Sequence, residues 1–384
     1  MKPLSFLIKP ASGLCNMRCR YCFYEDETNH REVKNHGMMS PDTAECLIRA
    51  ACSESDRDGE IHFAFQGGEP TLAGLPFFRR FIELVTAYAG PEQRVYFSIQ
   101  TNGSLLDEEW ASFFFENRFL VGLSLDGSRE MHDLYRVDAN GDGSWGRTVR
   151  SFRLLQRKSV DVNLLCVVTG QFARRPQQMY GALKKLGARY LQFIPCLDPL
   201  DAERGTLPFS LSAQEYGEFL CRLFDLWYRD WKSGSYVSVR QFDDYVHLLT
   251  GQAPSACSAA GHCGDYLVVE STGSLYPCDF YATDAWLLGD IREAGGLSKV
   301  FESEKACRFH EEGEQRPAAC RSCEWFFICR GGCKRDWCTA YDGEKKNYYC
   351  EAFRRFFPHS IERLREIALA EISYAHNVAY GNCP

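Results

Sequence analysis

The sequence has little that would direct the protein to a membrane or to nucleic acid. Only six uncharged residues lie between Lys2 and Lys9, too few for the apolar core of a signal peptide, and no stretch approaches a membrane span. Acidic residues outnumber basic ones by 51 to 44, so the net charge of −7 provides no basic face for phosphates. Internal repeats and low-complexity segments are also absent. We therefore expect a cytoplasmic protein, with no membrane and no nucleic acid among its partners.

Cysteine, in contrast, is abundant, with 19 among 384 residues. Thiols stay reduced in the cytoplasm, so clustered cysteines in such a protein indicate metal binding rather than disulfides. A hydrophobic content of 45% supports a large core, and this length is sufficient for one large barrel with an appended domain.

Short apolar runs alternate with amphipathic stretches over the first 200 residues. Six runs predict strands: Ser5–Ile8, Ile61–Phe65, Arg94–Ile99, Phe119–Leu125, Val162–Thr169 and Tyr190–Pro195. Helices are expected from about Ser40 onward and over Leu75–Tyr88, Asp107–Phe115 and Gln177–Leu186. This alternation is typical of a parallel α/β sheet, and six units predict an open, partial (β/α)6 barrel. Functional residues should follow the carboxyl ends of the strands.

The pattern changes after a helix expected over Ala213–Trp231. The segment Tyr266–Tyr281 has two β-rich runs around Ser271–Ser274, which predicts a hairpin. Cysteine-rich loops and a final helix over Phe353–Tyr374 follow. We place a domain boundary near residue 235, which gives a barrel domain of residues 1–235 and a cysteine-rich domain of residues 236–384.

The first cysteine motif is C-x3-C-x2-C and comprises Cys15, Cys19 and Cys22. A structural zinc site needs four ligands and a set of disulfides needs an even number of cysteines. Three thiolates suit an iron–sulfur cube in which one iron stays open to a small ligand. A zinc site completed by a distant His or Asp, or three cysteines in the core, remains an alternative at this point.

A glycine-rich segment, QGGEP, ends the second predicted strand one β/α unit after the cysteine motif. Together the two motifs resemble the radical S-adenosylmethionine (SAM) superfamily. The resemblance implies that SAM binds the open iron and that its reductive cleavage gives a radical that removes a hydrogen atom from substrate. It also implies five SAM-binding positions, namely Tyr21, Gly68, Ser124, Arg136 and Leu197. The alternatives are that Ser124 only satisfies a strand end and that Arg136 is a surface charge.

Eight further cysteines are grouped in the C-terminal part, four of them in the run C-x2-C-x5-C-x3-C. Eight thiolates would saturate two further cubes, whereas a zinc ribbon would leave four unexplained. The arrangement resembles the SPASM extension of radical SAM enzymes. That resemblance implies a first auxiliary cluster on Cys257, Cys263, Cys278 and Cys333, and a second on Cys320, Cys323, Cys329 and Cys350. The protein would then hold three [4Fe–4S] clusters. We interpret the scattered cysteines as core residues or incidental thiols: Cys46, Cys52, Cys166, Cys196, Cys221, Cys307, Cys338 and Cys383.

A closer resemblance extends over roughly residues 4 to 355. The segments LIKPASGLCNMRCRYCFY, HFAFQGGEPTLAG, FLVGLSLDG and LVVESTGSLYPCDFY resemble the anaerobic sulfatase-maturating enzymes. That resemblance implies oxidation of a cysteine or serine in an unfolded sulfatase, or in a sulfatase-motif peptide, to Cα-formylglycine. The auxiliary clusters would accept an electron, a donor such as flavodoxin or ferredoxin would supply one, and the enzyme would be a monomer.

The same resemblance makes Asp279, next to Cys278, the candidate base for the substrate thiol or hydroxyl. A negative charge nearby makes a carboxylate a stronger proton acceptor, and a cysteine-ligated cube is anionic. The alternative is that Asp279 only caps the hairpin end.

Two other functions remain open at this stage. A SPASM enzyme could form a thioether or carbon–carbon crosslink in a ribosomal peptide. Such enzymes often carry an additional N-terminal recognition domain, which we do not expect here because the first cysteine motif begins at Cys15. A non-catalytic iron–sulfur or zinc module would not turn over SAM, and it leaves the open-site motif unexplained.

Overall fold

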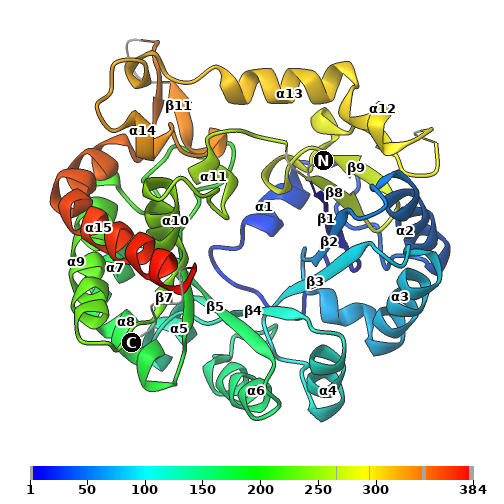
Figure 1. Cartoon of the computed structure of the whole chain (residues 1–384). Coiled ribbons are helices and arrows are strands. Elements are labelled where there is room, and N and C mark those ends of the chain that lie inside the picture. The colour runs from blue at the N-terminus through cyan, green and yellow to red at the C-terminus, as the bar shows by residue number, and fades with distance from the viewer. Residues whose placement is uncertain (1–2, 265, 294, 340–342, 380–384) are drawn as a thin grey trace. The chain divides into compact units, whose positions relative to one another are not determined.

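The computed structural model describes residues 3–264, 266–293, 295–339 and 343–379 (Figure 1). The chain forms two compact units, and each is built from several separate stretches of sequence. The first unit comprises residues 1–165, 197–203 and 264–311, and the second comprises residues 166–196, 204–263 and 312–384. The division into residues 1–235 and 236–384 that the sequence suggests stays a prediction.

The strands of the first unit form a parallel sheet in chain order. They are β1 (Leu4–Lys9), β2 (Glu60–Phe65), β3 (Arg94–Thr101), β4 (Leu120–Ser124) and the first part of β5 (Asp161–Val168). In the second unit the last part of β5 lies beside β6 (Tyr190–Pro195), because the amide of Cys196 donates to the carbonyl of Val168 over 2.9 Å. A short β7 (Ser238–Val239) pairs in parallel with β6. All six predicted strands are therefore present, with ends within two residues of the prediction.

The predicted hairpin is also present, and it extends the sheet of the first unit. Strand β8 (Leu267–Glu270) pairs antiparallel with β9 (Ser274–Tyr276), and β10 (Gly289–Asp290) lies beside β9. Gly273 has a φ of 97°, the left-handed conformation that such a turn needs. Strand β8 pairs in parallel with β1, with Phe6 opposite Leu267. The hairpin thus lies against the first strand of the chain.

Along the chain, most helices of the first unit connect one strand to the next, and α2, α3 and α4 cover one face of the sheet (Figure 1). The helices are α1 (Phe23–Asn29), α2 (Pro41–Glu54), α3 (Leu75–Tyr88), α4 (Glu108–Glu116), α5 (Arg129–Tyr135), α6 (Trp145–Arg157), α12 (Leu297–Phe301) and, across the unit boundary, α13 (Glu304–Glu314). Helix α2 begins where expected, because the Ser40 hydroxyl accepts from the amide of Thr43 and Pro41 occupies the first turn. Buried phenylalanines such as Phe65 and Phe81, in edge-to-face contact at 5.0 Å, fill the space between sheet and helices.

The second unit is mostly helical. Its helices are α7 (Gly170–Ala173), α8 (Pro176–Lys185), α9 (Ala213–Lys232), α10 (Arg240–Leu249), α11 (Cys257–Ala260), α14 (Phe326–Cys329) and α15 (Cys350–Ala379), and it has a small sheet of β11 (Trp337–Thr339) and β12 (Lys345–Asn347). Helices α9 and α15 pack closely at Gly217, where a Cβ atom would meet the Cα of Ala352 at 3.0 Å. The predicted final helix is confirmed, although it begins three residues earlier, at Cys350. No helix in the described ranges is long and apolar enough to cross a membrane.

Candidate active site

The loop that carries Cys15, Cys19 and Cys22 follows β1, and α1 begins directly after Cys22. Two backbone hydrogen bonds hold the loop, from Arg18 to the carbonyl of Val137 and from Arg20 to that of Tyr135, at 2.7 and 2.9 Å. The three thiols are therefore presented at the carboxyl end of the first strand, as the sequence suggests for a functional loop.

Burial controls the protonation of these thiols. It raises the pKa of Cys15 to about 12 and that of Cys19 to about 11, and it also raises the pKa of Cys22. The free thiols therefore hold their protons at neutral pH, and bound iron would be needed to keep them as thiolates. A cysteine donor set of this kind fits an iron–sulfur cube, whose natural ligands are thiolates.

The glycine-rich turn packs backbone to backbone against the cysteine loop. The Gly68 amide donates to Ser12 over 3.0 Å, and the Glu69 amide donates to Leu14 over 2.7 Å. A Cβ atom at Gly68 would collide with the carbonyl group of Leu14. The structure thus shows why glycine is needed at position 68, which the sequence did not reveal: the backbone approaches the loop before Cys15 too closely for a side chain. Whether Gly68 also contacts SAM stays a prediction.

We expect Gly68→Ala to destabilise the protein by about 1–3 kcal/mol, because the added methyl group must displace rigid backbone. The measurement is the urea midpoint of unfolding. Gly181→Ala is the matched control, since a Cβ there meets nothing within 4 Å and alanine is the better helix residue. Equal midpoints for Gly68→Ala and the wild type would contradict the packing argument.

Arg136 is buried and paired. Its side chain is 10% exposed, and its Nε lies 2.9 Å from Oδ2 of Asp126, which also accepts a hydrogen bond from the hydroxyl of Tyr21. Ser124, also buried, ends β4 two residues before Asp126. Arg136 is therefore not the surface charge that the sequence left open, and its contact with SAM stays a prediction. Asp126 was not predicted as a site residue, although it belongs to the segment FLVGLSLDG that resembles the family.

The segment with Leu197 contacts α1 through hydrogen bonds and an ion pair. The amide of Leu200 donates to the carboxylate of Asp26 over 3.0 Å, and His30 Nε2 lies 2.7 Å from a carboxylate oxygen of Asp201. Because Asp26 is four residues after Cys22, these contacts bring the Leu197 segment to the helix that begins at the cysteine loop. The predicted role of Leu197 in binding SAM is not tested by them.

Asp279 lies next to the same loop, although 255 residues separate it from Tyr24. Its carboxylate is buried, Tyr24 donates to Oδ2 over 2.7 Å, and the ammonium group of Lys9 lies 3.2 Å from Oδ1. Lys9 is the last residue of β1 and Tyr24 comes two residues after Cys22. The hairpin that pairs with β1 thus carries the candidate base to the loop with the three candidate cluster ligands.

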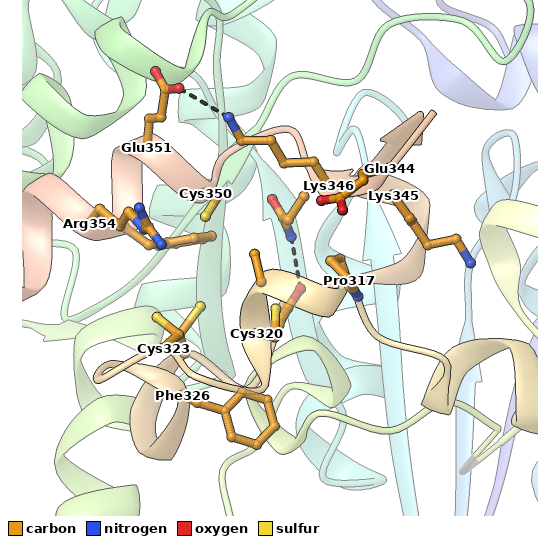
Figure 2. A pocket seen from close by; sticks show the side chains of 15 residues that line it. Pro317, Cys320, Cys323, Phe326, Glu344, Lys345, Lys346, Cys350, Glu351 and Arg354 are labelled. Atoms are coloured by element: carbon orange, nitrogen blue, oxygen red, sulfur yellow. Dashed lines mark hydrogen bonds and ion pairs between the residues drawn. The ribbon is translucent and has the colours of Figure 1, made fainter. Parts of the chain in front are cut away.

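A cavity of about 320 Å³ in the second unit is lined by four of the expected ligands (Figure 2). They are Cys320, Cys323, Cys329 and Cys350. Cys329 ends α14 and Cys350 begins α15, and burial raises the pKa of Cys329 to about 12. These are the four residues that the resemblance assigns to the second auxiliary cluster. The donor set and the space fit a cube, and the role of each residue as a ligand stays a prediction.

The expected ligands of the first auxiliary cluster are divided between the units. Cys257, Cys263 and Cys333 belong to the second unit and Cys278 to the first. No three His, Cys, Asp or Glu side chains in the described part of the chain are arranged to hold a single metal ion. The thiolates of a cube bind separate irons and need not converge in this way. This ligand set therefore stays a prediction.

The scattered cysteines vary in burial. Cys52, Cys166, Cys196 and Cys221 are buried, Cys46 is partly buried and Cys307 is exposed, whereas Cys383 lies outside the described residues. Cys338, close in sequence to the cysteine run, lies in β11 with its sulfur 3.5 Å from the carbonyl oxygen of Lys346.

Comparison with known proteins decides the family. Residues 10–181 match the model of the radical SAM superfamily, and residues 261–324 match SPASM, an iron–sulfur cluster-binding domain. Over 369 residues the chain is 44% identical to the cysteine-type anaerobic sulfatase-maturating enzyme of Clostridium novyi (strain NT), covering 96% of this chain and 98% of that protein. The chain belongs to the anaerobic sulfatase-maturating enzymes.

Other members of the anaerobic sulfatase-maturating enzymes are similar over nearly the same length. A cysteine-type enzyme of Clostridium perfringens (strain 13 / Type A) is 43% identical, covering 96% of this chain and 99% of its own. A serine-type enzyme of Bacteroides thetaiotaomicron is 32% identical, covering 93% and 89%. A solved structure described as "Native anSMEcpe with bound AdoMet and Cp18Cys peptide" superposes with a TM-score of 0.90 at 42% identity, covering 96% of this chain and 99% of that one.

These comparisons confirm the expected fold and enzyme class. The chain is a radical SAM enzyme with a C-terminal SPASM domain, and domains of these two families bind iron–sulfur clusters and SAM. The structure of Streptococcus suis SuiB bound to S-adenosylmethionine superposes with a TM-score of 0.58 at 15% identity, which shows a shared fold alone.

Proposed function

We propose that this enzyme oxidises a cysteine in an unfolded sulfatase to Cα-formylglycine, with Asp279 as the base. The observation that carries the proposal is the position of Asp279. Its buried carboxylate lies 2.7 Å from the hydroxyl of Tyr24, which comes two residues after the last cysteine of the three-cysteine loop. Identity to the cysteine-type relatives is 42–44%, against 32% for the serine-type relatives, and this difference favours cysteine as the target. Serine is the second candidate residue.

Three [4Fe–4S] clusters and SAM complete the proposal. The first cluster would be held by Cys15, Cys19 and Cys22. Cys257, Cys263, Cys278 and Cys333 would hold the first auxiliary cluster, and Cys320, Cys323, Cys329 and Cys350 the second. When bound, SAM and the first cluster supply hydrogen-atom abstraction, and the auxiliary clusters supply electron acceptance. SAM itself would be bound by Tyr21, Gly68, Ser124, Arg136 and Leu197.

Side chains of the enzyme carry out the remaining proton transfer. Asp279 takes the proton of the substrate thiol. The reference pKa of a thiol is about 8.5, so the substrate thiol is mostly protonated at neutral pH. Lys9 and Tyr24 hold the two carboxylate oxygens, so the base is fixed before substrate arrives. Water then converts the resulting thioaldehyde to the aldehyde.

The same proposal includes an electron donor such as flavodoxin or ferredoxin, a monomeric state and a cytoplasmic location.

The proposal is tested by anaerobic incubation of the enzyme with SAM, a reductant and sulfatase-motif peptides, followed by mass spectrometry. From a cysteine peptide we expect the mass change for replacement of sulfur by oxygen with loss of two hydrogens. From a serine peptide, loss of two hydrogens alone is the corresponding change. Loss of two hydrogens from a cysteine peptide with sulfur retained, together with fragmentation that shows a new bond between two residues, would instead indicate a crosslinking enzyme and would overturn the proposal.

The shape of the substrate gives a further prediction. An extended segment can enter the end of a barrel, whereas a motif inside a folded sulfatase cannot reach the buried Asp279. We expect peptides and urea-unfolded, diluted sulfatase to be converted and the native folded sulfatase to remain unmodified. The measurement is formylglycine content after equal incubation, with the same sulfatase in both forms as its own control. Equal conversion of the folded and unfolded forms would contradict the expectation.

A further inference from the structure

A closed ring of hydrogen bonds lies beside Cys15, and the proposed function does not use it. Asn102, the first residue after β3, donates from Nδ2 to Oδ1 of Asn16 over 2.9 Å. Asn16 donates in turn to the hydroxyl of Ser104 over 2.8 Å, and the backbone amide of Ser104 donates to Oδ1 of Asn102 over 2.8 Å. Because Asn16 directly follows Cys15 in the sequence, the ring joins the end of β3 to the three-cysteine loop.

The main chain of Asn102 is also held by hydrogen bonds. Its amide donates to Oε2 of Glu69 over 2.8 Å, and its carbonyl accepts from the hydroxyl of Thr148 over 3.2 Å. Glu69 comes from the glycine-rich turn after β2, Thr148 comes from α6, and both are buried. Asn102 is therefore fixed in position by three separate segments of the first unit, and its side chain is a preorganised hydrogen-bond donor.

These contacts determine which way the amide group of Asn102 faces. The backbone amide of Ser104 can only donate, so it contacts the oxygen of Asn102, and the nitrogen lies on the opposite side. This nitrogen carries two hydrogens, and Asn16 accepts one of them. The nitrogen also lies 3.9 Å from the sulfur of Cys15, within the range of a hydrogen bond to sulfur. The second hydrogen of the amide is therefore directed to Cys15.

The donors around Cys15 would act on the cluster that this residue helps to hold. The sulfur also accepts from the backbone amide of Met17 over 3.4 Å, so two N–H groups contact it. Reduction adds one negative charge to an iron–sulfur cube, and N–H groups directed at a ligand sulfur stabilise negative charge there. Hydrogen bonds to the sulfurs are one of the factors that set the reduction potential of such a cube.

We propose that Asn102 raises the reduction potential of the first cluster by donating an N–H···S hydrogen bond to Cys15. The inference rests on the proposed function, in which Cys15, Cys19 and Cys22 hold that cluster. The step concerned is a one-electron transfer, in which a low-potential flavin or iron–sulfur donor is oxidised and the cube is reduced. No covalent bond of Asn102 forms or breaks. Asn102 acts through Cys15, so it is a positioning residue.

Asn102→Ala tests this role, with Ser104→Ala as its matched control. The first variant removes the N–H donor. The second removes only the hydroxyl that accepts from Asn16, and the backbone amide of residue 104 still holds the oxygen of Asn102. The measurement is an anaerobic redox titration followed by electron paramagnetic resonance (EPR). The signal of the first cluster is the part of the spectrum that a variant lacks when all three cysteines of the loop are replaced by alanine.

In Asn102→Ala we expect the equilibrium constant for reduction of the first cluster to fall at least about tenfold. For one electron this is a fall of about 59 mV or more in the midpoint potential. Ser104→Ala should keep the wild-type potential. Asn102→Asp should lower the potential further than alanine does, because it removes the same donor and adds a negative charge near the sulfur. An unchanged potential in Asn102→Ala, or loss of the iron of the first cluster from this variant, would overturn the proposal and assign Asn102 a structural role.

The choice of reductant gives a second, independent measurement. With dithionite, the weaker reductant, Asn102→Ala should form 5′-deoxyadenosine at least about tenfold more slowly than the wild type. With titanium(III) citrate, the stronger reductant, the two rates should become nearly equal, because both proteins are then fully reduced. A deficit of the same size with both reductants would also overturn the proposal. Identical EPR spectra of the wild type and the variant without the three cysteines would instead reject the first cluster of the proposed function, and with it this role of Asn102.

Discussion

Replacing Cys15, Cys19 and Cys22 together by alanine should abolish formation of 5′-deoxyadenosine and remove one third of the bound iron. Three cubes of four irons give about twelve iron atoms per wild-type chain, and about eight should remain in the triple variant. The loss of SAM cleavage should be complete, because SAM would have no open iron to bind. Iron and sulfide analysis of anaerobically reconstituted protein measures the first effect, and chromatography of the nucleoside product measures the second.

Two other variants make this experiment specific. Cys320→Ala combined with Cys350→Ala removes two of the proposed ligands from the cavity of the second unit, so iron should also fall to about eight while SAM cleavage continues. Cys307→Ala changes an exposed, scattered cysteine and should leave both quantities unchanged. Saturation of the wild type with zinc, or with only about four irons, would contradict the proposal of three clusters.

Asp279→Asn should separate radical chemistry from product formation. The amide keeps the size of the carboxylate and can still accept from Tyr24 or Lys9, but it cannot take a proton. A positioned base contributes about 10²- to 10⁴-fold, so formylglycine should fall at least roughly a hundredfold. With a β-deuterated peptide, deuterium should still appear in 5′-deoxyadenosine, because the three-cysteine loop is unchanged.

The control for this variant is Asp284→Asn, five residues further along the same segment. Asp284 is exposed and accepts a hydrogen bond from the amide of Glu32 over 2.7 Å, so it shares the location but not the proposed chemistry. It should form product at nearly the wild-type rate. Full product from Asp279→Asn with intact clusters would rule out Asp279 as the base, whereas loss of iron would assign it a structural role.

Local patterns predicted the regular elements of the first unit well. Strand β2 alternates buried and partly buried residues, and helix α2 begins at a serine followed by proline, so short stretches of sequence determine both. Helix α6 was not predicted between β4 and β5. Its buried face includes Val149, Phe152 and Leu155. In the sequence these residues alternate with exposed arginines such as Arg150 and Arg153, so the segment as a whole is strongly polar.

The sequence did not predict which distant segments of the chain contact each other. The hairpin itself follows from the β-rich runs around Gly273, but nothing in those runs specifies that β8 will pair with β1. For the same reason Asp279 was a candidate through family resemblance alone, and its contacts with Lys9 and Tyr24 appeared only in the structure. Three of the cysteines around the cavity show the opposite case, because Cys320, Cys323 and Cys329 stand together in the cysteine run. Cys350 was grouped with them only through the family resemblance.

The pairing of β1 with β8 also constrains how the protein is made. Leu267 follows its partner Phe6 by 261 residues, so during synthesis at about 5–20 residues per second the edge of β1 stays open for roughly 15–50 seconds. An apolar strand such as Leu4–Lys9 with a free edge can pair with other chains. The delay has a second effect, because the cysteine loop just after β1 emerges from the ribosome long before the hairpin can close over that edge. The loop with Cys15, Cys19 and Cys22 is therefore exposed during the same interval in which the edge of β1 is open.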